Sequence, residues 1–83
     1  MTVERNTTLD LLRACIAEIA PETDVQAIDP ARALRRQVDL DSADWLNFLV
    51  AVHDKTGIDI PDAQAARLST LDQIADYVVQ RAV

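Results

Sequence analysis

The stretch Asp41-Ser42-Ala43-Asp44-Trp45 contains the most distinctive chemical group of this chain. It places a serine hydroxyl where an acidic turn runs into an apolar segment that is predicted to be helical. A nucleophilic serine needs a base to take its proton, and no histidine lies close to Ser42 in the sequence. We therefore predict that the hydroxyl is a handle for another enzyme, and that the protein is a carrier whose chemistry belongs to an attached group. The alternative from the residue alone is that Ser42 merely caps the helix.

Other candidate groups are weaker. His53 has no second histidine and no cysteine at metal-ligand spacing, so it is interpreted as a half-exposed helix residue. Asp41 and Asp44 could form a glycosidase-like carboxylate pair, but they would share one small helical surface without a cleft. The single cysteine, Cys15, excludes an internal disulfide and a multi-cysteine metal site, and its position predicts a small buried apolar side chain. The sequence thus predicts neither an enzyme active site nor a metal site.

Length and charge set further bounds. The 83 residues, 49% of them hydrophobic, suit one domain that we expect to span residues 1–83. The formal net charge is −6, and residues 39–62 hold one base, Lys55, against these acids: Asp39, Asp41, Asp44, Asp54, Asp59 and Asp62. This acidic stretch would repel nucleic acid and anionic lipid and attract basic protein surfaces, unless it serves solubility alone. Arg32, Arg35 and Arg36 are interpreted as a solvated loop face.

No apolar run approaches membrane-spanning length, and the first residues lack the apolar core of a secretory signal. We therefore expect a cytoplasmic monomer that neither binds nucleic acid nor inserts into a membrane.

The elements that must position Ser42 are predicted to be helices. A first helix is expected over residues 3–20, because Leu9, Leu12, Ile16 and Ile19 form one apolar stripe, and Pro21 should stop it. A long connection over residues 21–41 should be held to the core by isolated apolar residues and contain a short helix over residues 31–36. Those apolar residues are Val25, Ile28, Leu34, Val38 and Leu40.

A second helix is expected over residues 42–55 and should be central and largely enclosed, since its apolar residues cover most of its circumference. Gly57 should end it, Ile58 and Ile60 should fill the core, and Pro61 should open a short helix over residues 62–67. Thr70 and Gln73 form a capping-box pattern before a last helix. Its inward stripe would be Leu71, Ile74, Val78 and Ala82. The fold class is therefore all-α: a small antiparallel bundle of three main helices and one short one, with a long first loop.

About half of the chain resembles the acyl carrier protein family. The resemblance rests on the spacing between four segments rather than on the Asp-Ser pair alone. They are Leu40-Asp41-Ser42-Ala43-Asp44-Trp45-Leu46, Thr56-Gly57-Ile58-Asp59-Ile60-Pro61-Asp62, Leu68-Ser69-Thr70-Leu71 and Asp76-Tyr77-Val78.

The resemblance implies a covalent cofactor. Ser42 would be the attachment site for 4′-phosphopantetheine, which a phosphopantetheinyl transferase moves from coenzyme A, and Asp41 would help the transferase to recognise the site. The thiol of the arm would hold an acyl or aminoacyl group as a thioester for acyl-activating or acyl-transferring enzymes. The rival hypothesis is a carrier-like interaction protein that is never modified and binds a basic partner through its second helix.

Several positions depart from the family pattern. Asp39 stands where glycine is usual, and Ala43, where the family commonly has leucine or methionine, offers a partner little contact area. Asn47, His53 and Lys55 make the second helix less acidic than usual. These departures suggest a specialised lipid or secondary-metabolite pathway.

The predicted partner-binding residues follow the serine on the second helix. They are Ala43, Asp44, Trp45 and Asn47. The sequence leaves open whether Trp45 belongs to the core or to a partner surface.

Overall fold

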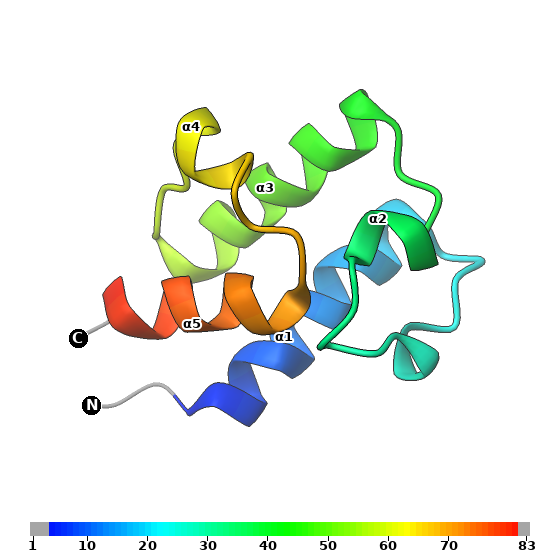
Figure 1. The fold of residues 1–83 in the computed structure, drawn as a ribbon, viewed down its shortest axis with the longest axis horizontal. Coiled ribbons are helices and arrows are strands. Elements are labelled where there is room, and N and C mark those ends of the chain that lie inside the picture. The colour runs from blue at the N-terminus through cyan, green and yellow to red at the C-terminus, as the bar shows by residue number, and fades with distance from the viewer. Residues whose placement is uncertain (1–3, 82–83) are drawn as a thin grey trace.

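The computed structural model describes residues 4–81, which form a small helical bundle (Figure 1). Three longer helices are joined by connections that contain three shorter ones. The elements are α1 (Arg5–Ile19), the 3₁₀ helix η1 (Val25–Ala27), α2 (Leu34–Gln37), α3 (Ser42–Thr56), α4 (Asp62–Ala65) and α5 (Leu71–Arg81). Within residues 4–81 there is no β-strand, and Ala33 and Thr70 form one isolated bridge. The predicted all-α bundle with three main helices is confirmed.

Helix α1 is the element that contacts both of the other long helices, α3 and α5. Leu12, Cys15 and Ile16 are completely buried on its inner side, as the apolar stripe predicts. The helix ends at Ile19, one residue before its predicted end, because Ala20 precedes a proline and leaves the helical backbone region. Val3, the predicted first residue, lies outside the described part of the chain.

The prediction that α3 is largely enclosed is wrong. Phe48 and Val52 are completely buried, whereas Leu46 and Val50 are 55% and 50% exposed. Three longer helices surround only part of each other's circumference, and α4 is a single turn, so one apolar side of α3 faces solvent. Gly57 ends the helix as predicted, with a left-handed φ of 72° that favours glycine.

The connection from α1 to α3 is held to the core by its isolated apolar residues, as predicted. Four of these residues are buried: Ile28, Leu34, Val38 and Leu40. The fifth, Val25, is half-buried and lies in η1, a helix that the sequence analysis did not predict. The short helix begins three residues later than predicted. The Asp29 carboxylate accepts a hydrogen bond from the Ala31 amide at 2.9 Å and fixes a turn there, which delays the helix to Leu34.

The C-terminal part follows its sequence signals closely. Ile60 is buried, and Pro61 precedes α4 as its cap instead of being its first residue. Helix α4 ends two residues before the predicted Arg67, which lies in the turn that follows. The capping box at α5 is confirmed. The backbone amide of Gln73 donates to the Thr70 hydroxyl at 3.0 Å, and the backbone amide of Thr70 donates to the side-chain oxygen of Gln73 at 3.2 Å.

The inward stripe of α5 is buried at Leu71, Ile74 and Val78, while Ala82 lies outside the described residues. Arg5, at the start of α1, forms ion pairs with Asp72 at 2.9 Å and Asp76 at 2.8 Å on α5. The hydrogen bonds to Asp76 and, to a smaller extent, to Asp72 raise the pKa of Arg5.

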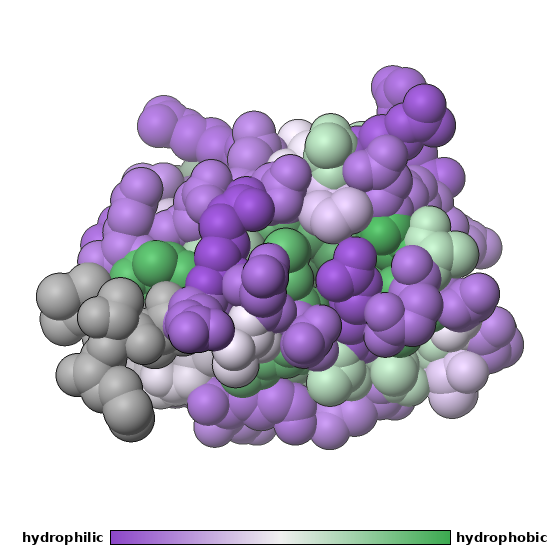
Figure 2. Space-filling view, turned by 90° about the horizontal axis from the view of Figure 1, so that it is seen from below, coloured by the Kyte–Doolittle hydropathy of each residue, from purple (hydrophilic) through white to green (hydrophobic). Residues whose placement is uncertain are grey.

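Two features of the outer shape matter for the site. The start of α1 and the end of α5 lie at one side of the bundle, and α3 begins at the opposite side (Figure 1). Hydrophilic side chains cover most of the face in Figure 2, with smaller apolar areas between them. None of the helices in residues 4–81 is long and apolar enough to cross a membrane.

Candidate functional site

Ser42 is the first residue of α3 and its side chain is exposed. The residue before it, Asp41, has an extended backbone and caps the helix: its carboxylate accepts a hydrogen bond from the backbone amide of Asp44 at 2.8 Å. The alternative in which Ser42 itself is the cap is therefore wrong. Since aspartate takes that role, the serine oxygen does not have to satisfy a helix amide.

The Ser42 hydroxyl has no side-chain partner in the described part of the chain. At this helix start the backbone amides of Asp44 and Trp45 donate to Asp41, whereas those of Ser42 and Ala43 have no partner in the described part of the chain. Unpaired amides at a helix start favour a negatively charged group. The site can thus accept a bulky phosphate ester on the serine without breaking a contact that the fold needs.

A shallow groove of about 330 Å³ begins at Ser42 and runs between α3 and α4. Its lining combines one base, one acid and apolar side chains. The lining residues are Arg35, Ser42, Trp45, Leu46, Leu49, Asp62, Ala65 and Ala66. A second hollow of about 210 Å³ shares Leu46, Leu49 and Asp62 with it and extends along α3 to His53. Ser42 therefore stands at one end of a partly apolar path along the surface.

Trp45 belongs to both the core and this groove. Its ring stacks on that of Phe48, with 5.5 Å between centroids and 29° between planes. The Arg35 guanidinium lies 5.7 Å from the Trp45 ring centre, within the range of a cation–π contact. Trp45 is half-buried, so core packing does not exclude contact with a ligand or a partner.

The predicted partner residues are partly grouped. Ala43 and Asn47 are exposed, and helical spacing places them on one side of α3 with Leu46 and Val50. We call these four residues the docking face. Sequence reasoning missed Leu46 and Val50 because it expected other helices to enclose most of α3. Asp44 is half-buried near the helix start, beside this face.

The acidic stretch keeps its negative field. Five of its six aspartates are exposed, Asp44 being the exception, and none of the six is in an ion pair within residues 4–81. Its one base, Lys55, instead pairs with Glu18 of α1 at 2.9 Å, which raises the Lys55 pKa. Because Lys55 pairs with Glu18 of α1, it does little to offset the negative charge near Ser42.

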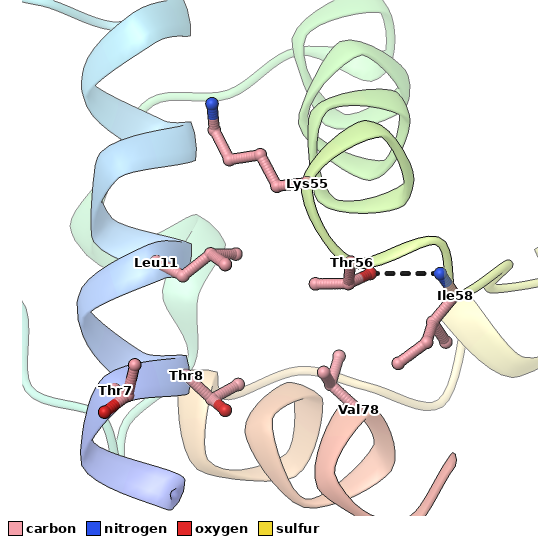
Figure 3. Close-up of a pocket in the computed structure, with 7 residues that line it drawn as sticks. All are labelled: Thr7, Thr8, Leu11, Lys55, Thr56, Ile58 and Val78. Carbon is pink, nitrogen blue, oxygen red and sulfur yellow. Dashed lines mark hydrogen bonds between the residues drawn. The ribbon is translucent and has the colours of Figure 1, made fainter. Parts of the chain in front are cut away.

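Within residues 4–81, the remaining candidate groups are not brought together into a site. His53 is exposed, and no cluster of three or more metal-ligating side chains occurs in the described part of the chain. Cys15 is buried, and burial raises the pKa of its thiol to about 11. A further pocket, with a volume of about 200 Å³, has a mixed lining of polar and apolar side chains (Figure 3). The lining residues are Thr7, Thr8, Leu11, Lys55, Thr56, Ile58 and Val78. The pocket lies at the end of α3 opposite Ser42, roughly 20 Å away along the helix axis.

Comparison with known proteins agrees with this geometry. The family model described as a phosphopantetheine attachment site matches residues 10–78. The acyl carrier protein of Streptomyces coelicolor is 32% identical over 79 residues, which cover 95% of this chain and 86% of the relative. The acyl carrier protein of Acidothermus cellulolyticus is 31% identical over 100% of this chain and 98% of its own length. The acyl carrier protein of Thermobifida fusca is 33% identical over 84% of this chain and 87% of its own length.

This chain belongs to the acyl carrier protein family. The predicted family is confirmed. Its members are carriers and not enzymes, and they hold a covalent 4′-phosphopantetheine. Its partners therefore include a phosphopantetheinyl transferase and acyl-handling enzymes. The residues present fit this cofactor, because the exposed hydroxyl of Ser42 is free and a groove leads away from it.

Proposed function

We propose that Ser42 is the attachment residue for 4′-phosphopantetheine, and that this carrier delivers the acyl group from one pathway enzyme to the next. The observation that supports this best is the capping of α3 by Asp41, which leaves an exposed serine hydroxyl at the helix start without a structural role. When bound, the cofactor supplies a thiol that holds the acyl group as a thioester.

The residues of the chain itself would orient the attached group and its partners. Asp41 fixes the start of α3 and so the direction of Ser42, and its second carboxylate oxygen is available to a metal ion or a basic side chain of the transferase. The unpaired amides of the first turn would stabilise the phosphate. Because the acceptor serine needs no base in the carrier, proton removal is left to the transferase.

Partner enzymes would be recognised in two ways. The acidic stretch acts at long range and attracts enzymes with a basic surface. The docking face acts at short range, where Leu46 and Val50 offer apolar area that a partner can bury. The small Ala43 sets this carrier apart from the usual family pattern, which supports a specialised lipid or secondary-metabolite pathway over general fatty-acid synthesis. The proposal includes a cytoplasmic location.

Modification in vitro tests the attachment residue. The purified protein is incubated with a broad-specificity phosphopantetheinyl transferase and coenzyme A, and its intact mass is recorded. The wild type should gain one phosphopantetheine and Ser42→Ala none. The chain has one other serine, Ser69, so Ser69→Ala is a matched control that should be modified normally. A gain that persists in Ser42→Ala, or no gain in the wild type, would contradict the proposal.

A further inference from the structure

Arg35 is the one basic residue among the described residues that line the groove at Ser42. The sequence places it in a cluster with Arg32 and Arg36, but the structure separates Arg35 from the other two. Arg32 lies 3.7 Å from the Asp29 carboxylate, and Arg36 lines a different hollow together with Arg32 and Gln37. Arg35 alone of these three faces the path that starts at the serine.

The guanidinium of Arg35 is held at two points. One terminal nitrogen donates a hydrogen bond to the carbonyl oxygen of Leu40 at 3.1 Å, two residues before Ser42. The guanidinium carbon lies 5.7 Å from the ring centre of Trp45. These contacts restrict a long side chain to the neighbourhood of the serine and lower the entropy that it would lose on binding a ligand.

Arg35 also retains donors for an anion. A guanidinium has five N–H donors, and the contact with Leu40 uses one of them. Among residues 4–81, no carboxylate lies within ion-pair distance of Arg35, although Asp62 lines the same groove. A cation without an acidic partner, beside a serine that receives a phosphate, has an obvious electrostatic complement in that phosphate.

We propose that Arg35 binds the phosphodiester of the arm on Ser42 and directs the arm into the groove between α3 and α4. This inference rests on the proposed attachment at Ser42. The polar start of the arm would lie at Arg35, and the part that follows would contact Trp45 and Leu49. Arg35 is thus a positioning residue: it sets how often the arm lies along the protein and how often it is free in solvent.

Nuclear magnetic resonance of the apo and modified forms tests this. Trp45 is the only tryptophan, so its indole N–H gives one assignable signal in the groove. In the wild type this signal should shift between the two forms. In Arg35→Gln the shift should be about two- to fivefold smaller, the range expected for loss of an ion pair between exposed groups. Arg35→Lys, which keeps the charge, should restore part of it.

Arg36→Gln is the matched control, because it removes the same charge from the adjacent, exposed residue. Its shift should equal that of the wild type. An unreduced shift in Arg35→Gln, or an equal reduction in Arg36→Gln, would overturn the inference. Intact mass is measured on every sample, so a variant that is modified but has an unreduced shift contradicts the role of Arg35 alone. Absence of modification in the wild type would overturn both proposals.

Discussion

The carboxylate of Asp41 accepts a hydrogen bond from the backbone amide of Asp44, with 2.8 Å between oxygen and nitrogen. This bond starts α3 and leaves Ser42, between the two, with an exposed side chain. Asp41 therefore combines a structural role, as helix cap, with the recognition role expected from the family resemblance. Substitutions can separate these two roles.

Removing the Asp41 carboxylate should weaken the fold and slow modification. Asp41→Ala is expected to lower the free energy of unfolding by about 1 kcal/mol, because an uncapped helix amide remains. Asp41→Asn should keep the stability within about 0.5 kcal/mol, since asparagine caps as well as aspartate. Both should be modified more slowly by the transferase, because both lack the charge. Chemical denaturation and the rate of mass gain measure the two effects.

Asp39→Asn is the control for this pair. It removes the same charge from an exposed residue two positions away that does not cap a helix. It should leave both the stability and the modification rate close to the wild type. If Asp41→Asn were modified at the wild-type rate, Asp41 would be a helix cap and nothing more.

Trp45 and Leu46 are adjacent but should behave differently when truncated. Trp45→Ala should lower the free energy of unfolding by about 1–3 kcal/mol, because half of the ring packs against Phe48 and the core. Leu46→Ala should change it by less than about 0.5 kcal/mol, because that side chain is 55% exposed. Leu46→Ala should instead slow modification through the weakened docking face. If Leu46→Ala lost as much stability as Trp45→Ala, Leu46 would be packed against the core and not exposed.

Cys15 should be unreactive in the folded apo protein. Its pKa of about 11, against an ordinary 9.0, lowers the thiolate fraction at pH 8 roughly 100-fold, and burial blocks access as well. A thiol reagent should therefore label the native apo form slowly and the urea-unfolded form quickly. Fast labelling of the native apo protein would contradict the buried position. After modification, the thiol of the arm should label quickly, and Ser42→Ala should remove that fast phase.

The same thiol should make the fold sensitive to alkali. Its pKa is higher in the folded protein than in the unfolded chain, so the folded state holds the proton more tightly. Ionisation of Cys15 should leave the free energy of unfolding unchanged below about pH 9 and should lower it as the pH rises from about 9 to about 11. Cys15→Ala should flatten this part of the curve, measured by denaturation at each pH. An unchanged slope in the variant would assign the loss to other groups.

Salt should stabilise the apo protein. The aspartates of the acidic stretch repel one another, and Lys55 is paired with Glu18 outside it. Screening that recovers about 0.5–1 kcal/mol should raise the melting temperature by roughly 2–8 °C, and a divalent cation should act at lower concentration. Asp54→Asn with Asp59→Asn should respond less. A flat response in the wild type would mean that these carboxylates are too far apart to interact.

Local signals in the sequence predicted the boundaries of the elements well. Gly57 marked the end of α3, because glycine adopts the positive φ of a helix end without steric cost and this preference does not depend on distant residues. Thr70 and Gln73 marked the start of α5 because both partners of the capping box lie within one turn. The start of α2 was misplaced, because the Asp29 turn competes locally with the helix and because the Leu34 amide donates to Ser69, far away in the sequence.

The surface of α3 could not be predicted in the same way. A helical pattern shows which residues are apolar but not how much of the circumference other helices cover, so other helices were expected to enclose Leu46 and Val50. The groove lining was missed for a related reason. Arg35 meets Trp45 only because the α2–α3 connection folds back, and no periodicity in the sequence records that contact. Ser42, the proposed attachment residue, could be chosen from its neighbours in the sequence, whereas the groove around it required the tertiary structure.

The two ends of the described chain lie on the side of the bundle away from the start of α3 (Figure 1). A resin, a sensor chip or a fused reporter joined at either end would therefore hold the molecule with Ser42 directed outward. Immobilised in that orientation, the protein should present its serine to a transferase as readily as it does in free solution. Single-molecule and affinity experiments can thus use terminal attachment without obstructing Ser42.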